Sequence, residues 1–190
     1  MNPHIALVAA RVAALLLLAS TARAAAVNAA PSAETLCRSW FGAEAVLAPL
    51  PEAPTNALVR QVTRNGQPAG WIFRTDQIPP ACKGKRGEIV LLVALGTDAR
   101  IKGVQILSHR EDPAYFKRLK SGFFDQFNNL LASGSEPKVD AVTRATLSSR
   151  AIIREVVEGA RHVAALPEVA CKINASQQCS LTKMPPVSHN

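Results

Sequence analysis

The chain has 190 residues, a formal net charge of +8 and 48% hydrophobic residues. This length suits one domain with a sizeable core. The basic residues are scattered apart from short clusters at 83–86 and 117–120. Neither cluster is interleaved with aromatic side chains, which argues against nucleic acid as a partner. The charge indicates only a general attraction to anionic partners or to a membrane surface.

Residues 1–26 have the features of a signal peptide. Arg11 precedes an apolar run of Ala and Leu over 12–19, and the small residues around Arg23 fit a cleavage site. The run is shorter than the roughly 20 residues that a membrane span needs. We therefore expect export, in preference to an uncleaved N-terminal membrane anchor, with the charge falling from +8 to +6 as both arginines leave.

Four cysteines, Cys37, Cys82, Cys171 and Cys179, follow this segment. An even number of thiols in an oxidising compartment predicts disulfide bonds. Cys171 and Cys179 would close a small loop, which leaves Cys37 with Cys82, although four cysteines allow three connectivities. The sequence has no CxxC, no CxxCH and no clustered Cys/His ligand set, so no metal site is expected.

The N-terminal half predicts strands. Residues 27–56 are expected to form an arm with a short helix over 33–41 and a proline-rich linker. Asn65-Gly66 predicts a hairpin turn between strands at 59–63 and 69–75. The near-continuous apolar run at 88–95 is typical of a central strand buried on both faces, and residues 100–107 alternate like a half-buried strand.

The C-terminal half predicts helices. From Pro113 the apolar residues recur at helical spacing, with Gly122 as the break between two short helices. A long amphipathic helix follows residue 146, Pro167 ends it, and residues 167–190 are expected to be a loop-like tail. The fold class is α+β: an antiparallel sheet flanked by helices, in a single domain over 57–166.

The polar turn at 140–150 is the candidate functional site. Thr146 lies where the turn enters the long helix, and a helix N-terminus binds phosphate through its unpaired amides and its partial positive charge. A hydroxyl at that position can be esterified to a phosphate. Asp140, Thr143 and either Ser148 or Ser149 can cap the turn. The alternative is that all these hydroxyls are helix caps and nothing more.

The segment Asp140-Ala141-Val142-Thr143-Arg144-Ala145-Thr146 resembles the D-x-x-[ST]-G-A-T motif of the FMN-binding domain family. That family includes periplasmic subunits of ion-translocating oxidoreductases and domains of nitrous-oxide-reductase regulators. The resemblance implies that a flavin transferase joins FMN to Thr146 through a phosphoester, with Asp140 and Thr143 as motif residues. Arg144 replaces the motif glycine, whose usual role is a positive φ or a close backbone approach. Its guanidinium could instead pair with a phosphate oxygen.

A second segment, His109-Arg110-Glu111-Asp112-Pro113, resembles the family's H-x-E-x-P-G loop, with Ala114 in place of the glycine. Trp71, Phe73, Tyr115 and Phe116 are further candidates for contact with the flavin ring, although core packing is expected for at least two of them. The residues expected to bind the cofactor are His109, Glu111, Asp140, Thr143, Arg144, Ala145, Thr146, Leu147 and Ser148.

These features predict a periplasmic flavoprotein that relays electrons, with membrane or periplasmic redox proteins as partners. The chain shows no nucleophile–base pair and no pair of acid–base carboxylates, so an electron carrier or a subunit of a redox complex is expected rather than a stand-alone enzyme. The alternative is a flavin-free, degenerate domain that serves as a binding or sensory partner of such a complex.

Overall fold

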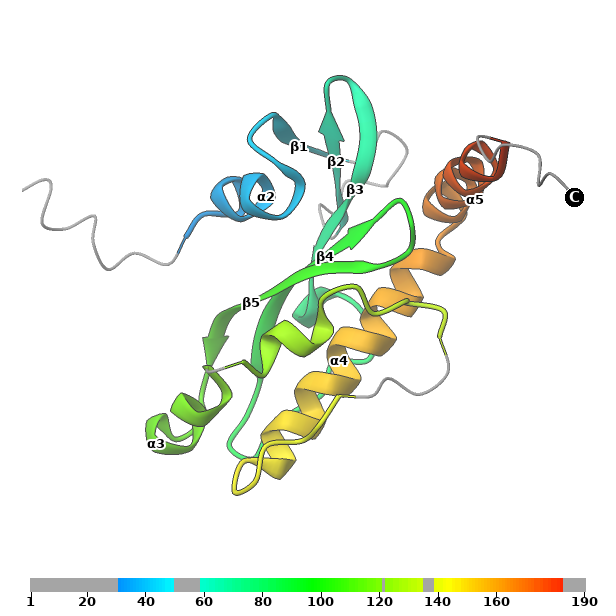
Figure 1. The fold of residues 1–190 in the computed structure, drawn as a ribbon. Helices are drawn as coiled ribbons and strands as arrows, with labels where there is room; N and C mark the ends of the chain where they lie inside the picture. Colours follow the sequence, from blue (N-terminus) through cyan, green and yellow to red (C-terminus); the bar gives the residue numbers. More distant parts are fainter. Residues whose placement is uncertain (1–30, 50–58, 121, 135–138, 183–190) are drawn as a thin grey trace, which may run out of the picture. The chain divides into compact units, whose positions relative to one another are not determined.

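The computed structural model describes residues 31–49, 59–120, 122–134 and 139–182, so the expected signal peptide lies outside the described residues. All described helices and strands belong to one compact unit, Ala33–Asn190. Its centre is a five-stranded antiparallel sheet in which each strand pairs with its neighbours along the chain (Figure 1). The strands are β1 (Ala45–Pro49), β2 (Val59–Arg64), β3 (Gln67–Arg74), β4 (Ile89–Gly96) and β5 (Ile101–His109).

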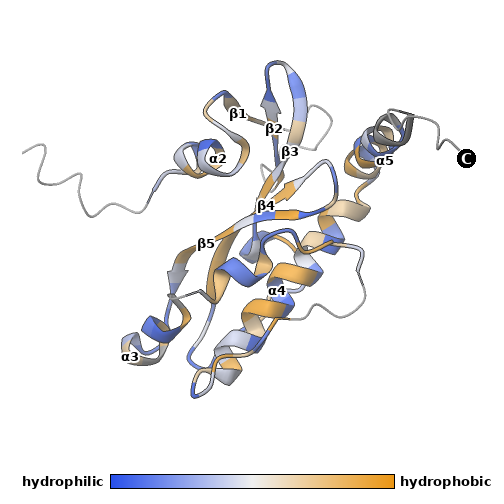
Figure 2. Ribbon diagram, in the orientation of Figure 1, coloured by the Kyte–Doolittle hydropathy of each residue, from blue (hydrophilic) through white to orange (hydrophobic). Residues whose placement is uncertain are grey.

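The predicted hairpin and central strand are confirmed. Asn65 and Gly66 connect β2 to β3 with φ values of 53° and 73°, the left-handed conformation that this dipeptide favours in tight hairpins. Every residue of β4 is buried, and β4 carries hydrophobic colouring over much of its length in Figure 2. β1 differs from prediction, because it lies in the segment expected to be arm and linker but pairs with β2 from Ala45 to Pro49.

The two faces of the sheet pack against different helices, so the α+β fold class is confirmed. On one face, Trp71 and Phe73 of β3 join a large core with α4 (Thr146–Ala165). On the other face, Ile72 packs in a smaller core with α2 (Ala33–Phe41). Alternate residues of β4 enter the two cores, which explains why its sequence is apolar throughout.

The segment between β5 and the polar turn forms short helical pieces. They are α3 (Pro113–Phe116) and the 3-10 turns η2 (Lys117–Lys120) and η3 (Phe124–Phe127). Gly122, the predicted break, has a φ of 74°. Phe116, Phe123 and Phe127 are buried in the core with α4, so the aromatic spacing of this segment serves packing.

The expected loop-like tail is wrong over most of its length. Pro167 ends α4 but also begins a second helix, α5 (Pro167–Thr182). Proline is well suited to the first position of a helix, where its missing N–H is not needed. Val169 and Ile173 of α5 are buried in the α4 core, and this packing accounts for a helix that its weak apolar pattern did not predict.

The cysteine pairing is also wrong for the described thiols, because Cys37, Cys82 and Cys171 are free. A disulfide requires Cα atoms roughly 4–7 Å apart. Cys171 and Cys179 are eight residues apart on α5, which places their Cα atoms about 12 Å apart. Cys37 lies in the core with α2, whereas the Cys82 amide bonds to Glu155 of α4 on the opposite face of the sheet.

Within the described part of the chain, none of the helices is both long enough and apolar enough to cross a membrane.

Candidate functional site

A pocket of about 390 Å³ lies at the first turn of α4. Three segments line it: Lys85 and Arg86 from the loop before β4, Glu111 and Asp112 after β5, and residues 144–148 of the polar turn and helix. Its volume falls within the roughly 300–1,000 Å³ range of small-molecule sites. The structure thus brings the two segments that carry the family resemblance to one cavity.

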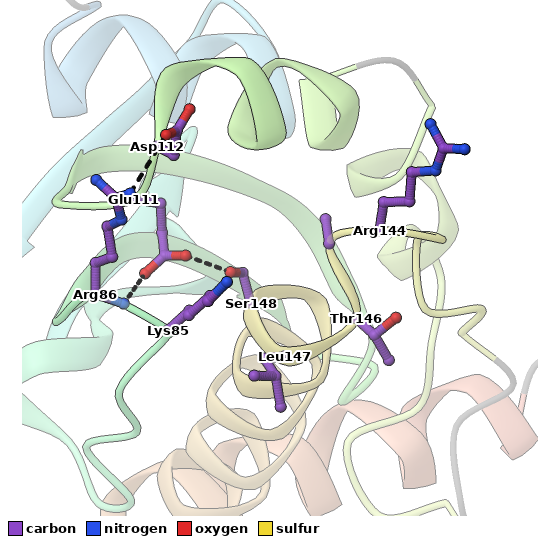
Figure 3. Close-up of a pocket in the computed structure, with 9 residues that line it drawn as sticks. Lys85, Arg86, Glu111, Asp112, Arg144, Thr146, Leu147 and Ser148 are labelled. Atoms are coloured by element: carbon purple, nitrogen blue, oxygen red, sulfur yellow. Dashed lines mark hydrogen bonds and ion pairs between the residues drawn. The ribbon is translucent and has the colours of Figure 1, made fainter.

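The carboxylate of Glu111 connects the three segments (Figure 3). One oxygen accepts a hydrogen bond from the Ser148 hydroxyl at 2.5 Å, and the other accepts one from the Arg86 amide at 2.7 Å. Glu111 is 6% exposed and Ser148 is 5% exposed, so solvent cannot replace these bonds. Glu111 therefore fixes the loop and the start of α4 as two walls of the pocket.

Gly84 allows the loop to approach that carboxylate. A Cβ atom at this position would lie 2.6 Å from a Glu111 oxygen and 2.8 Å from Ile89 Cδ1. Any side chain would push the loop away and separate the Arg86 amide from its acceptor. Glycine is required here for close packing, because it alone lacks a Cβ.

Arg144 occupies the motif position at which the family has glycine, and its φ is +65°. The left-handed conformation expected of that glycine is therefore present with an arginine in its place. A non-glycine residue in this conformation costs about 1–2 kcal/mol. The guanidinium extends away from the first turn of α4 in Figure 3, and its side chain makes no ion pair or hydrogen bond with any other described residue.

Ser149 holds the polar turn against the helix. Its hydroxyl accepts a hydrogen bond from the Val142 amide at 3.1 Å and donates one to the Thr146 carbonyl at 3.1 Å. The N-cap residue of α4 is Ala145, which offers no side-chain cap. The amides of the first helical turn, which have no partner within any α-helix, are therefore available to an acceptor in the pocket.

Thr146 is the first residue of α4 and is half-buried. Among the described residues, its hydroxyl makes only a long contact, 3.5 Å, with the Val142 carbonyl. A hydrogen bond of that length holds a hydroxyl weakly. In Figure 3 the side chain points away from the Glu111–Ser148 pair, so the buried carboxylate does not use the Thr146 hydroxyl.

Three of the residues predicted to bind the cofactor do not line the pocket. Asp140 and Thr143 are exposed in the turn and do not cap the helix, and the Asp140 amide bonds instead to the Gln126 side chain at 2.9 Å. The His109 ring stacks on Phe116 with a centroid separation of 3.5 Å, and its Nδ1 is buried without a hydrogen-bond partner among the described residues.

Of the four aromatic candidates for the flavin ring, Trp71, Phe73 and Phe116 are each at most 2% exposed in the core. None of these three lines the pocket. The Tyr115 side chain lies outside the described residues. Packing therefore accounts for these three rings, which confirms the expectation that at least two of the four serve the core.

Sequence reasoning missed the contribution of Lys85 and Arg86. Both belong to the basic cluster at 83–86. The sequence shows this cluster, but no sequence pattern connects it with the other segments of the site. Arg86 also forms an ion pair with Asp112 at 3.5 Å, which links the loop before β4 to the segment after β5. Gly84 lies within the same cluster. A glycine at this position was the one signal in the sequence that the backbone here approaches another segment closely.

A buried carboxyl group lies farther along α4. Glu155 is 3% exposed, one of its oxygens accepts a hydrogen bond from the Cys82 amide at 2.9 Å, and the other has no partner among the described residues. Burial raises the pKa of Glu155 to about 7, although the Cys82 amide and the Thr75 hydroxyl favour its ionised form. Burial also raises the pKa of the Cys82 thiol, which disfavours a reactive thiolate.

The pocket residues fit a flavin phosphate. An uncapped helix N-terminus, the neighbouring Arg144 guanidinium and the cationic side chains of Lys85 and Arg86 suit an anion. Leu147, 62% exposed, offers apolar surface at the same cavity. The pocket therefore offers cationic groups for a phosphate and an apolar surface for a ring.

The family comparison agrees with this geometry. Residues 84–160 match the family model described as an FMN-binding domain, and every residue that lines the pocket falls within the match. The match begins after β3, although β2 and β3 complete the same sheet and core. No curated protein matches the sequence. Residues 84–160 are therefore similar to the FMN-binding domain family, and this match supports FMN as the cofactor of the protein.

Proposed function

We propose that this protein is an exported electron carrier in which FMN is joined through its phosphate to Thr146. The observation that carries the proposal is the position of Thr146, the first residue of a 20-residue helix whose uncapped N-terminus faces the pocket. Bound FMN supplies the redox chemistry, and the chain supplies attachment, orientation and electrostatics.

The phosphate is assigned to the first turn of α4. The turn amides would stabilise its charge, because a helix N-terminus favours an anion. The Arg144 guanidinium extends away from this turn, so it would contribute only after its side chain turns toward the phosphate. In the attached form, a phosphoester at Oγ1 would replace the hydroxyl proton of Thr146. The donor would carry FMN on an activated phosphate, such as the pyrophosphate of a flavin dinucleotide. Its P–O bond to the nucleoside monophosphate would break as the bond to Oγ1 forms, and the hydroxyl proton would pass to a base of the transferase. The weak contact of that hydroxyl with Val142 supports the assignment, because little is lost when the oxygen is esterified.

Attachment requires a flavin transferase, which is one proposed partner. The other partners are the membrane or periplasmic redox proteins that deliver and accept electrons. Export rests on the sequence of residues 1–26 alone, and the free thiols of Cys37, Cys82 and Cys171 add no support for an oxidising compartment.

The test is to produce the whole chain together with a flavin transferase in a bacterial periplasm. The recovered protein should be yellow, should keep its flavin after unfolding and gel filtration, and should show both the attached FMN and the loss of the leader in its intact mass. Thr146→Ala should release all flavin on unfolding. Ser133→Ala is the matched control, because it removes an exposed hydroxyl that lies outside both the pocket and the motif.

Flavin that stays attached to the unfolded Thr146→Ala variant would refute this attachment residue. A colourless wild-type protein would refute the electron-carrier proposal and favour the flavin-free binding module. A full-length mass with the leader intact would refute cleavage without bearing on the flavin site.

A further inference from the structure

A second cavity lies beside the FMN pocket, with a volume of about 480 Å³. It is lined by residues 80–83 of the loop before β4 and by Leu147, Arg150, Ala151 and Arg154 of α4. Leu147 lines both cavities, so the two hollows meet at this residue. The proposed attachment of FMN to Thr146 does not use the second cavity.

The lining of the second cavity is cationic. Lys83, Arg150 and Arg154 contribute positive charge, and the lining contains no acidic residue. Arg154 pairs with Glu158 at 3.1 Å, whereas the exposed side chains of Lys83 and Arg150 form no ion pair in the described part of the chain. Desolvating these two cations therefore requires an acidic group from outside.

The FMN pocket extends this charge across Leu147. Arg144 adds a further exposed cation without an ion pair among the described residues. The acidic residues of that pocket are already engaged: Glu111 with Ser148 and the Arg86 amide, and Asp112 with Arg86. Lys83, Arg144 and Arg150 together form a basic rim, and Leu147 lines both of the cavities to which these cations belong.

The basic rim and Leu147 together resemble a protein–protein interface in the arrangement of charged and apolar residues. Leu147, 62% exposed, is a large apolar side chain surrounded by charged ones, and an apolar centre with a polar border is typical of transient interfaces. A bilayer fits less well, because it presents a flat surface to this hollow. Membrane-binding segments also carry several exposed apolar residues together.

We propose that the basic rim and Leu147 form the docking surface for an acidic redox protein that exchanges electrons with the flavin. The inference rests on the proposed electron-carrier function, because docking at the edge of the FMN pocket places the partner beside the cofactor. Opposite charges would steer the encounter, raising the association rate at low ionic strength.

The probe is a small acidic [2Fe–2S] ferredoxin of the plant type, with binding measured by biolayer interferometry. The immobilised chain is the flavin-free form of the wild type and of the Lys83→Glu/Arg150→Glu variant. We expect the wild type to bind at low salt and lose affinity as salt rises. The double variant should associate roughly tenfold more slowly or worse. At about 1 M salt, where the screening length is about 3 Å, the difference should vanish.

Arg38→Glu combined with Arg118→Glu is the matched control, with two charge reversals at exposed arginines on α2 and η2, away from both cavities. Circular dichroism establishes that each variant is folded. Because the flavin-free chain is used, failure of Thr146 attachment would leave this binding result unchanged. The holoprotein then tests electron transfer, whose rate should follow the same order among the variants.

Three results would overturn the proposal. One is no binding of the acidic ferredoxin at low salt. Another is that the control variant weakens binding to the ferredoxin as much as the Lys83→Glu/Arg150→Glu variant does. The third is stronger, rim-dependent binding to phosphatidylglycerol vesicles than to the ferredoxin, which would make the surface a membrane-binding one.

Discussion

Replacing Glu155 by glutamine should remove a pH dependence from the stability of the fold. Glu155 is 3% exposed in α4, and one of its two carboxylate oxygens has no hydrogen-bond partner among the described residues. Desolvation of the charged form is the largest cause of its raised pKa, and the nearby charges of Asp76 and Glu88 act in the same direction. Hydrogen bonds from Cys82 and Thr75 oppose the shift.

The sign follows from proton binding. The pKa of Glu155 rises from 4.5, the ordinary value expected in the unfolded chain, to about 7 in the folded protein. Between these values the folded state holds a proton that the unfolded state has lost, so the free energy of unfolding falls as pH rises. The stabilising contribution is complete below pH 4.5 and is lost as pH passes through about 7. The full effect is about 3 kcal/mol, at 1.36 kcal/mol for each pKa unit.

The assay is urea unfolding of the wild type and of Glu155→Gln at several pH values between about 5 and 8.5. Glutamine keeps an oxygen acceptor for the Cys82 amide but cannot ionise. The two proteins should have similar stability near pH 5, and the variant should be more stable by up to about 3 kcal/mol above pH 8. Other titrating groups cancel in this difference.

Glu158→Gln is the control on the same helix, because Glu158 is partly exposed and paired with Arg154. Such a pair contributes at most about 1 kcal/mol, and its loss should change little with pH. A constant difference between Glu155→Gln and the wild type across the pH range would refute the assignment of a buried carboxyl that titrates near neutrality.

Two further predictions concern the turn and the thiols. Arg144→Gly should raise the free energy of unfolding by up to about 1 kcal/mol, because glycine adopts a positive φ without strain, whereas Arg144→Val should lower it. Chemical denaturation measures both, and equal stability of the three proteins would contradict the strained turn. A maleimide should label the exposed Cys171 quickly and the buried Cys37 only after unfolding. Absence of reaction at Cys37 in the unfolded, non-reduced protein would contradict the free thiol.

The parts of the fold that sequence reasoning predicted correctly depend on local patterns. Asn65-Gly66 specifies a hairpin wherever strands flank it, and the apolar run of β4 requires burial on both faces. The amphipathic pattern of α4 similarly predicts a long helix against the sheet. In each case the residues that carry the signal are also the residues that form the element.

The missed elements depend on distant partners. β1 is a short segment of Ala, Val, Leu and Pro, and only its pairing with β2 makes it a strand. α5 has a weak apolar pattern but gains buried contacts at Val169 and Ile173. The disulfide prediction failed for the same reason, because spacing along the sequence does not report that α5 separates two cysteines or that the sheet separates Cys37 from Cys82.

The residues that line the pocket also fall into two groups: those that local sequence patterns predicted and those that long-range contacts bring there. Residues 144–148 are contiguous, so a turn followed by a helix places them together, and the second motif segment supplied Glu111. Lys85 and Arg86 come from a loop that no local pattern connects to the turn. A long-range hydrogen bond from the Arg86 amide to Glu111 holds this loop at the pocket. Gly84 makes the close approach possible because it has no Cβ.

Arg144 shows what the loss of a motif residue means physically. The motif glycine implied a backbone position with positive φ, and the structure has that conformation, at +65°, with an arginine. The substitution therefore costs strain of about 1–2 kcal/mol but leaves the turn in the shape that glycine would allow. It also adds a cation to the lining of the pocket at the first turn of α4. A degenerate turn would lose its geometry and leave the pocket without this charge. The departure from the motif thus changes the electrostatics of the site rather than its backbone, which is why the flavin-free alternative gains nothing from it.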